Sequence, residues 1–283
     1  KNAKHRNGQR LSRARPASAS HGRPRRHNPR MGTLYLVRHG QASFGADDYD
    51  QLSELGQRQS VRLGQYLRER LGAALHFDAV LSGTLRRQLG TWQGIAEGGG
   101  IEAPAPRRAG PPQAASAPSG GSADTPARSV GAHILWPGLN EYDSHAVIAA
   151  IHPQPLPKPD TPELYRQHFR LLRDGLAAWM DGRLQPVGMP SYVDFRAGVV
   201  GALDHVREHY EGNVLIVSSG GPIATAVAHI LDAPAATSIE LNLRIRNTAV
   251  TEFAFNPKRH QLVTYNTLPH LDAAAFRDWV TYA

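Results

Sequence analysis

The sequence predicts an α/β fold with three layers, in which helices cover both faces of a mostly parallel central sheet. Short apolar runs alternate along the chain with longer segments whose apolar residues recur at helical spacing, a pattern typical of strand–helix–strand units. Glycine, proline and small polar residues bound the apolar runs, as expected of strands. With 283 residues, 41% of them hydrophobic, the chain can fill one sizeable core. Edge strands of such a sheet can be antiparallel.

Two strand–helix pairs are predicted at the start of this pattern. Residues 33–37 are apolar, aromatic or β-branched and predict the first strand. Ser53 offers an N-cap, and apolar residues then recur at helical spacing as far as Leu71. Residues 77–81 predict a second strand, and residues 85–96 predict the helix that follows it.

Further helix starts and strands are predicted in the second half of the chain. Thr161 offers an N-cap and is followed by Pro162, which suits a first helical position, so we expect a helix to about Met180. Ser191 with Asp194 resembles a capping box, which predicts another helix start. Additional strands are expected at residues 133–136, 214–217, 239–245, 249–255 and 262–265, the last two pairing across a turn at 256–257.

The positive charge of the chain is concentrated in residues 1–30. These residues include ten Lys and Arg and no acid, so the net charge of +8 becomes −2 for residues 31–283. The segment has too few large apolar residues to form a core, and we expect it to be disordered. It could be a nucleic-acid-binding arm, a transit-like peptide, or sequence upstream of a true start at Met31. We favour the last interpretation, which makes nucleic acid an improbable partner.

A second compositionally biased segment covers residues 98–130. It is rich in glycine, proline, alanine and serine and has almost no large apolar residue, which is typical of a surface insertion. Strand–helix alternation resumes at about residue 133, so the segment interrupts one domain rather than separating two. We therefore expect residues 31–283 to form a single domain.

Composition also excludes several classes of protein and site. The chain has no cysteine, which rules out disulfides and thiolate metal sites. No apolar run approaches the roughly 20 residues needed to span a bilayer, so we expect a soluble, cytoplasmic protein without a membrane partner. The histidines are scattered, and no cluster with metal-ligand spacing is evident.

Two strand ends have residues suited to chemistry on anions. Arg38-His39-Gly40 follows the first predicted strand, and Ser218-Ser219-Gly220-Gly221 follows the strand at 214–217. Ligands of open α/β sheets bind beyond the carboxyl ends of the strands. The second segment also begins a helix, so its N–H groups could bind an anion.

These residues resemble the motifs of the histidine phosphatase (phosphoglycerate-mutase-like) superfamily. The run Leu36-Val37-Arg38-His39-Gly40-Gln41 is similar to the signature of that family. Four further segments resemble its motifs in the same order along the chain: residues 52–56, 77–87, 139–141 and 214–223. The resemblance implies the three-layer fold described above and a reaction on phosphate esters.

The resemblance also implies a role for each matching residue. His39 would be the nucleophile that forms a phosphohistidine, and Glu141 would protonate the leaving oxygen. Arg38 and Arg87 would bind the phosphoryl group as charged, bidentate donors. Ser219 and Gly220 would complete the phosphate site. Neither a metal ion nor an organic cofactor is expected, because the arginines would neutralise the phosphate.

The sequence departs from the family pattern at two positions. Ser219 stands where the family has a second histidine, and losing such a charge-assisted donor costs roughly 1.5–3 kcal/mol, about one to two powers of ten in rate. Gly45 stands where the mutases and several phosphatases of the family have asparagine, and Ser43 could supply a hydroxyl instead. Asp143 is the alternative to Glu141 as proton donor. His229 is interpreted as a structural or surface residue.

These features support a leading hypothesis and several alternatives. The leading one is a phosphatase acting on a small-molecule phosphate ester or another phosphorylated substrate. A phosphoglycerate mutase and a catalytically weakened phosphate-binding protein are the alternatives, whereas a serine hydrolase using Ser219 lacks the expected Gly-x-Ser-x-Gly motif. A homodimer is compatible with the sequence. Specificity is expected to come from residues 142–190. The basic and aromatic residues there fit an anionic substrate and fit a solvated surface equally well: His145, His152, Lys158, Tyr165 and Arg166.

Overall fold

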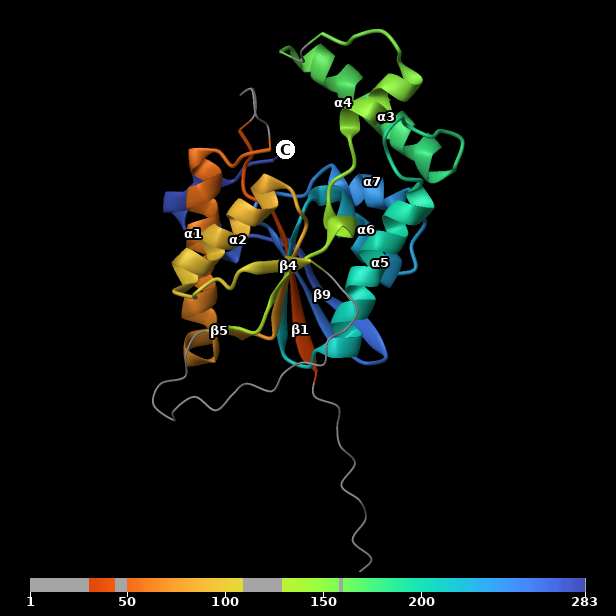
Figure 1. Ribbon diagram of the computed structural model, residues 1–283. Helices are drawn as coiled ribbons and strands as arrows, with labels where there is room; N and C mark the ends of the chain where they lie inside the picture. The colour runs from red at the N-terminus through yellow and green to blue at the C-terminus, as the bar shows by residue number, and fades with distance from the viewer. Residues whose placement is uncertain (1–30, 44–49, 109–128, 158–159, 283) are drawn as a thin grey trace, which may run out of the picture.

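The structure is a computed structural model that describes residues 31–43, 50–108, 129–157 and 160–282 (Figure 1). The predicted disordered segment 1–30, Gly45, Lys158 and most of the predicted insertion at 98–130 lie outside the described residues. None of the helices within the described ranges has the length and apolar character that a bilayer crossing requires.

A seven-stranded mixed sheet forms the centre of the molecule, in the order β4-β6-β3-β7-β1-β8-β9. The five strands from β4 to β1 are parallel, and β8 and β9 continue the sheet as an antiparallel edge. The strands are β1 (Gly32–Arg38), β3 (Ala79–Ser82), β4 (Pro106–Arg108), β6 (His133–Leu135), β7 (Asn213–Ser218), β8 (Val250–Asn256) and β9 (Arg259–Thr267). The predicted fold class, with its antiparallel edge and the hairpin at 256–257, is therefore confirmed.

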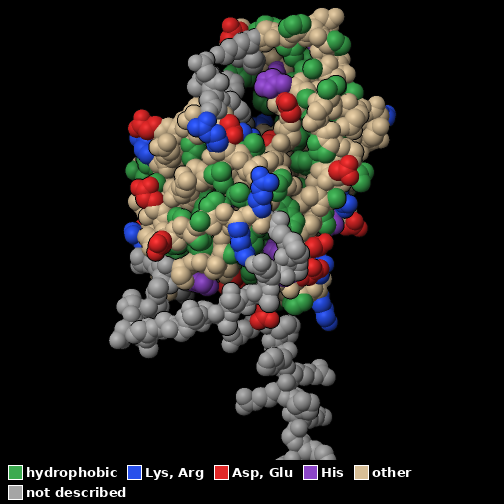
Figure 2. All heavy atoms as spheres, in the orientation of Figure 1, with side chains coloured by type: hydrophobic (Ala, Val, Ile, Leu, Met, Phe, Trp, Pro, Cys, Tyr) green, Lys and Arg blue, Asp and Glu red, His purple; other side chains and the backbone are tan. Residues whose placement is uncertain are grey.

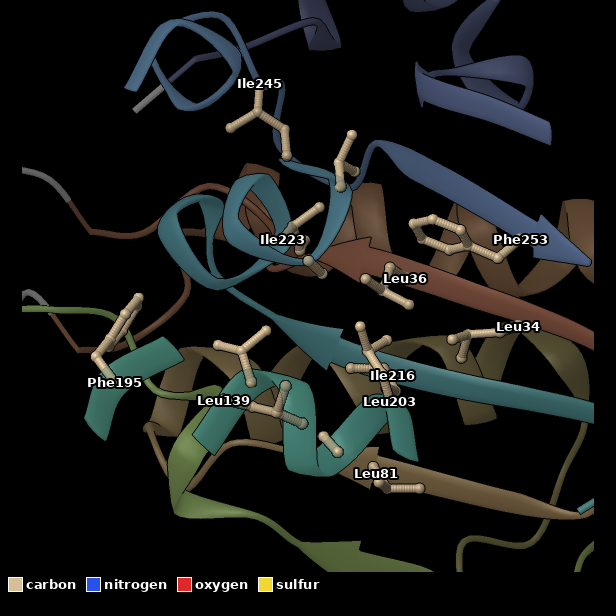
Figure 3. Close-up of a cluster of buried hydrophobic side chains, with 14 of the residues drawn as sticks. Leu34, Leu36, Leu81, Leu139, Phe195, Leu203, Ile216, Ile223, Ile245 and Phe253 are labelled. Carbon is tan, nitrogen blue, oxygen red and sulfur yellow. The ribbon is translucent and has the colours of Figure 1, made fainter. Parts of the chain in front are cut away.

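Alternating side chains of the central strands build two cores, one on each face of the sheet. On β1, Leu34 and Leu36 face one side, and Tyr35 and Val37 face the other. The neighbouring β7 alternates in the same way, and all of these side chains are buried. Figure 3 shows the first core, where Leu34, Leu36 and Ile216 from the strands lie against side chains from the helices.

The second core is covered by α1 (Glu54–Leu71) and α2 (Arg86–Gly99), which lie together on one side of the sheet (Figure 1). Ser53 caps α1 as predicted, since its side chain accepts a hydrogen bond from the backbone N–H of Gly56 at 3.0 Å. The two helices pack closely at Gly98, where a Cβ atom would collide with the backbone of Val61. This close packing holds the end of α2 against α1.

The first core is covered by α5 (Tyr192–His209) and α6 (Gly220–Ile230) on the opposite side of the sheet (Figure 1). Ser191 caps α5 through the N–H of Asp194, as predicted. Because α6 begins immediately after β7, its N-terminus lies at the carboxyl ends of the parallel strands. The C-terminal ends of β1 and β7 and the N-terminal ends of α2 and α6 therefore lie at the same end of the sheet.

Two further helices, α3 (Ser144–Ile151) and α4 (Pro162–Met180), stand beyond that same end (Figure 1). Thr161 caps α4 and the helix ends at Met180, both as predicted. The part of the predicted specificity region that the structure describes includes both helices, with His145 on α3 and Tyr165 on α4. Figure 2 shows a hollow between these helices and the body of the molecule, with charged side chains along its border.

Two sequence predictions need correction. Residues 239–245 do not form a strand, because residues 237–242 form helix α7 (Thr237–Asn242). Their alternating aliphatic residues suggested a period of two, but Ile239 and Ile245 instead bury their side chains against α6 and its neighbours. The segment 98–130 is also not structureless throughout, since α2 extends to Gly99 and the short strands β4 and β5 (Ser129–Val130) lie near its ends.

The segment 268–282 returns from the edge strand β9 to the end of the sheet where β1 finishes. It includes the two short 3-10 turns η3 (Pro269–Leu271) and η4 (Ala274–Trp279). Leu268 and Leu271 pack with Ala249 in a small third core. The segment is therefore held beside the loop that follows Arg38.

Candidate active site

The predicted site residues come from four different elements at the carboxyl end of the parallel strands. Arg38 is the last residue of β1, His39 follows it, and Arg87 lies in the first turn of α2. Ser219 lies between β7 and α6. Glu141 follows the 3-10 turn η2 (Pro137–Leu139).

His39 is buried and held by two hydrogen-bond partners, one at each ring nitrogen. Its Nδ1 lies 2.7 Å from the backbone oxygen of Gly40, and Nε2 lies 3.2 Å from the Nε of Arg87. A carbonyl oxygen can only accept a hydrogen bond and a guanidinium can only donate one. The proton is therefore assigned to Nδ1, and Nε2 keeps an unshared electron pair.

The surroundings of His39 favour its neutral form. Burial lowers the pKa of His39 well below its usual value, and the charges of Arg38 and Arg87 lower it further, against a smaller opposing effect of the Gly40 carbonyl. An imidazole in this environment remains unprotonated at neutral pH and below. Its Nε2 is thus available as a nucleophile over a wide pH range.

The two arginines near His39 are anchored by different partners. The Nη1 of Arg38 donates to the backbone oxygen of Ile245 at 2.6 Å. The Nη1 of Arg87 donates to a carboxylate oxygen of Asp50 at 2.8 Å, and the second oxygen of Asp50 accepts the backbone N–H of Arg86 at 2.9 Å. Asp50 therefore holds both the start of α2 and the guanidinium next to the imidazole.

Glu141 places its carboxylate at the N-terminus of α6. Its Oε2 accepts the backbone N–H of Gly221 at 3.1 Å, and a Cβ atom on Gly221 would collide with the other carboxylate oxygen. The sequence predicts an anion site at the N–H groups of these glycines. In the structure, the carboxylate of Glu141 lies against Gly221. Gly220 lies against Asn242 and Ile245, where a Cβ atom would likewise collide. Both glycines are thus required by close packing.

The carboxyl group of Glu141 is suited to holding a proton. Burial raises the pKa of Glu141, and this effect outweighs the lowering by the Gly221 N–H and by the charges of Arg87 and Arg38. Asp143, the alternative proton donor, instead caps α3 through the N–H groups of His145 and Ala146. Its side chain is 60% exposed. Of the two acids, Glu141 is therefore the buried one.

Ser219 is fully buried and bonded to a neighbour that the sequence did not single out. Its hydroxyl oxygen accepts the side-chain N–H of Gln88 at 2.9 Å. Gln88 also donates to the backbone oxygen of Leu139 at 3.0 Å, and its Oε1 accepts the N–H of Leu85 at 3.3 Å. The buried amide of Gln88 therefore ties α2 to the segment before Glu141 and to Ser219.

Other predicted residues lie farther from this arrangement. Ser43 lies in the loop after β1, where its backbone N–H donates to the oxygen of Gln51. His229 lies near the end of α6 and bonds to Arg196, in agreement with a structural role. Within the described ranges, no group of three or more acidic or histidine side chains has the arrangement of a metal site.

Sequence reasoning missed Asp50, Gln88 and Thr91. Thr91 lies one turn along α2 from Arg87, and its hydroxyl accepts the backbone N–H of Gly40 at 2.9 Å. A helical period of about four residues places Thr91 on the same face as Arg87, which is the one signal that could have identified it. Asp50 and Gln88 are revealed only by the contacts that they make in three dimensions.

Comparison with known proteins identifies a family match. The sequence model of the histidine phosphatase superfamily (branch 1) matches residues 34–107 and 159–268, which make up more than half of the chain. The matched ranges include Arg38, His39, Arg87 and Ser219, whereas Glu141 lies between them. No curated protein matches the chain in sequence.

Several solved structures share the fold. A protein described as mycobacterial hydrolase 2 is 21% identical and has a TM-score of 0.53, with 88% of this chain and 97% of that chain covered. A mycobacterial glucosyl-3-phosphoglycerate phosphatase is 22% identical, with a TM-score of 0.51 and coverage of 84% and 100%. A phosphoserine phosphatase from Entamoeba histolytica, solved as a mutant with phosphoserine, is 20% identical, with a TM-score of 0.50 and coverage of 85% and 100%.

Replacing Asp50 by asparagine is expected to strengthen the binding of inorganic phosphate. The substitution removes a negative charge beside Arg87 and retains an oxygen that can accept the Arg86 N–H. We expect the Kd of orthophosphate, measured by calorimetry, to fall by up to roughly fivefold, since pairs of this kind are worth up to about 1 kcal/mol. Asp181→Asn, which removes an exposed partner of Arg183, is the control. Weaker phosphate binding by Asp50→Asn would mean that Asp50 aids binding by orienting Arg87 more than it opposes binding by its negative charge.

Proposed function

Because the chain belongs to the histidine phosphatase superfamily, we propose that it is a phosphatase that hydrolyses phosphate monoesters through a phosphohistidine on His39. The observation that carries the proposal is the state of the imidazole, whose Nδ1 is engaged by Gly40 and whose Nε2 lies against Arg87. A neutral, oriented ring beside two guanidinium groups is the arrangement that a nucleophile for a phosphoryl group requires.

In the first step, Nε2 of His39 attacks the phosphorus and the bond from phosphorus to the ester oxygen breaks. Arg38 and Arg87 bind the non-bridging oxygens, where the negative charge of the transition state is spread. To do so, Arg87 exchanges its contact with Nε2 for contacts with the phosphoryl group. Glu141 gives its proton to the departing oxygen, so that an alcohol leaves rather than an alkoxide.

In the second step, water attacks the phosphorus of the phosphohistidine and the bond to Nε2 breaks. Glu141, now a carboxylate, accepts a proton from the attacking water. The products are inorganic phosphate and the neutral imidazole, with Nδ1 still bonded to Gly40. The same two arginines stabilise the charge in both steps, and the mechanism uses no residue outside the set described above.

The substrate class that we propose is a small phosphorylated molecule. Two of the structurally similar proteins are described as phosphatases of phosphoserine and of glucosyl-3-phosphoglycerate, which supports hydrolysis of small esters rather than isomerisation. Figure 2 shows the hollow beside α3 and α4. His39 follows β1 at the carboxyl end of the parallel strands, the end beyond which these helices stand, and the leaving group would occupy this side.

A phosphate-binding protein with weak turnover is the second candidate, and Ser219 favours it. A serine supplies at most one neutral donor in place of a charged imidazole. The oxygen of Ser219 already accepts a bond from Gln88, so its own hydrogen is the only group that it can offer to a phosphoryl oxygen. Turnover measurements on His39 and Ser219 variants distinguish the two candidates.

We expect His39→Ala to abolish turnover, because no other group can accept the phosphoryl group. The measurement is phosphate release from a panel of phosphate esters, together with acid-labile, base-stable labelling of the protein by a ³²P ester. His209→Ala, which alters an exposed histidine at the end of α5, is the control and should retain both turnover and label. Unchanged turnover in His39→Ala would refute the proposed mechanism.

We expect Glu141→Gln to slow the hydrolysis of alkyl phosphates far more than that of nitrophenyl phosphate. An alkoxide needs a proton in order to leave, whereas a nitrophenolate does not, and general acids contribute roughly 10²–10⁴-fold. Because burial raises the pKa of Glu141, the alkyl phosphatase activity should fall as pH rises through that pKa, and this limb should vanish in the variant. Equal effects on both substrates would exclude Glu141 as the acid.

Restoring a histidine at position 219 is expected to require removal of Gln88. Ser219 is fully buried against the Gln88 amide, so Ser219→His alone should overfill the site and lower the free energy of unfolding by roughly 1–3 kcal/mol. The double variant Ser219→His with Gln88→Ala makes room, and we expect its kcat to exceed that of Gln88→Ala by roughly tenfold or more. A double variant no faster than Gln88→Ala would show that a cation at 219 adds nothing.

A further inference from the structure

Two successive peptide units follow His39, and both are held by buried side chains. The oxygen of the first unit, that of His39, accepts the amide N–H of Asn247 at 3.1 Å and the backbone N–H of Thr248 at 3.3 Å. The nitrogen of the same unit, that of Gly40, donates to Thr91. This peptide unit is thus fixed at both ends.

The second peptide unit contains the acceptor for the imidazole. Its oxygen, that of Gly40, bonds to Nδ1 of His39, and its nitrogen, that of Gln41, donates to the side-chain oxygen of Gln59 at 2.9 Å. The direction of the Gly40 carbonyl sets the direction of the ring. Asn247 and Gln59 therefore control the orientation of the imidazole through the backbone, without touching the ring itself.

One hydroxyl group joins these two amides. The Oγ1 of Thr281 donates to the side-chain oxygen of Asn247 at 3.0 Å and accepts the side-chain N–H of Gln59 at 2.9 Å. The backbone oxygen of Thr281 also accepts the N–H of Asn247 at 3.0 Å. Asn247 and Gln59 are at most 1% exposed, so a lost partner could not be replaced readily by water.

Thr248, the residue after Asn247, has a strained backbone conformation. Thr248 has a φ of 54°, in the left-handed region that β-branched residues avoid at a cost of roughly 1–3 kcal/mol. Its N–H reaches the oxygens of both Arg38 and His39, and its hydroxyl bonds to the backbone oxygen of Asn247 and to buried His270. Segment 268–282 thus reaches the turn through both His270 and Thr281.

We infer that Thr281 is a positioning residue for the nucleophile, acting through Asn247 and Gln59 on the two peptide units that orient His39. Segment 268–282 then belongs to the functional site, although it contributes no group to the phosphate. The kinetic part of this inference rests on the proposed function, because it assumes that His39 attacks phosphorus. The geometric part concerns the hydrogen bond from Nδ1 to Gly40 and is independent of any substrate.

The test is Thr281→Val, which keeps the shape of the side chain and removes the hydroxyl. We expect kcat for a phosphate ester to fall roughly tenfold to hundredfold, the effect of a small misplacement of a reacting group, while KM stays within about twofold because both arginines remain. In proton NMR, the Nδ1–H signal of His39, assigned by its loss in His39→Ala, should exchange with water faster than in the wild type. Thr281→Ser, which restores the hydroxyl, should recover both properties.

Thr267→Val is the matched control, since the Thr267 hydroxyl donates to the oxygen of Val250 on the sheet edge. Thermal unfolding of each variant separates folding from function. The inference is overturned if Thr281→Val leaves kcat and the Nδ1–H exchange rate within about twofold of wild type. It is also overturned if Thr267→Val lowers kcat and speeds Nδ1–H exchange as much as Thr281→Val does. A wild-type protein without turnover would refute the proposed function alone, and the Nδ1–H exchange rate would then decide the inference.

Discussion

The hydrogen bond between Nδ1 of His39 and the carbonyl of Gly40 is the interaction on which the rest of the site depends. It fixes the position of the ring proton and therefore leaves Nε2 as the reactive nitrogen. Without it, the ring could rotate or exchange tautomers, and Nε2 would no longer be held as the acceptor for the Nε–H of Arg87. Because the acceptor is the backbone oxygen of the next residue, the orientation of the proposed nucleophile depends on the path of the local backbone. The surrounding elements then act mainly to hold that path.

Burial of charge is the second constraint, and it explains the different protonation states of His39 and Glu141. Two guanidinium groups beside a buried imidazole oppose a third positive charge, so His39 remains neutral. The same burial opposes a negative charge on Glu141 and raises its pKa, although both arginines and the Gly221 N–H act in the other direction. One low-polarity environment thus favours the uncharged form of both groups.

Sequence patterns predicted the scaffold of this site well, because its signals are local. The strand before Arg38, the capped helix after Ser53 and the glycine-rich turn before α6 each follow from a few neighbouring residues. The strand predicted at residues 239–245 was wrong, because alternating aliphatic residues are compatible with a strand and also with a short buried helix. Gln88, Asn247 and Thr281 escaped notice for another reason. Their partners are distant in sequence, as Gln88 and Ser219 are 131 positions apart, and no local pattern encodes such a pair.

In the proposed mechanism, a serine at position 219 in place of a second histidine would have an electrostatic consequence beyond the loss of a donor. An additional cation in the pocket would lower the pKa of Glu141, as Arg87 and Arg38 already do, and would favour its ionised form. A neutral serine removes that effect, and the carboxylate of Asp50 further reduces the positive charge around Arg87. A bound phosphate dianion would then raise the pKa of Glu141 more effectively, because fewer cations compensate its charge. A serine at this position would thus weaken the binding of the transferred group and favour the protonated form of the proposed acid, so its cost should depend on how strongly the leaving group requires a proton.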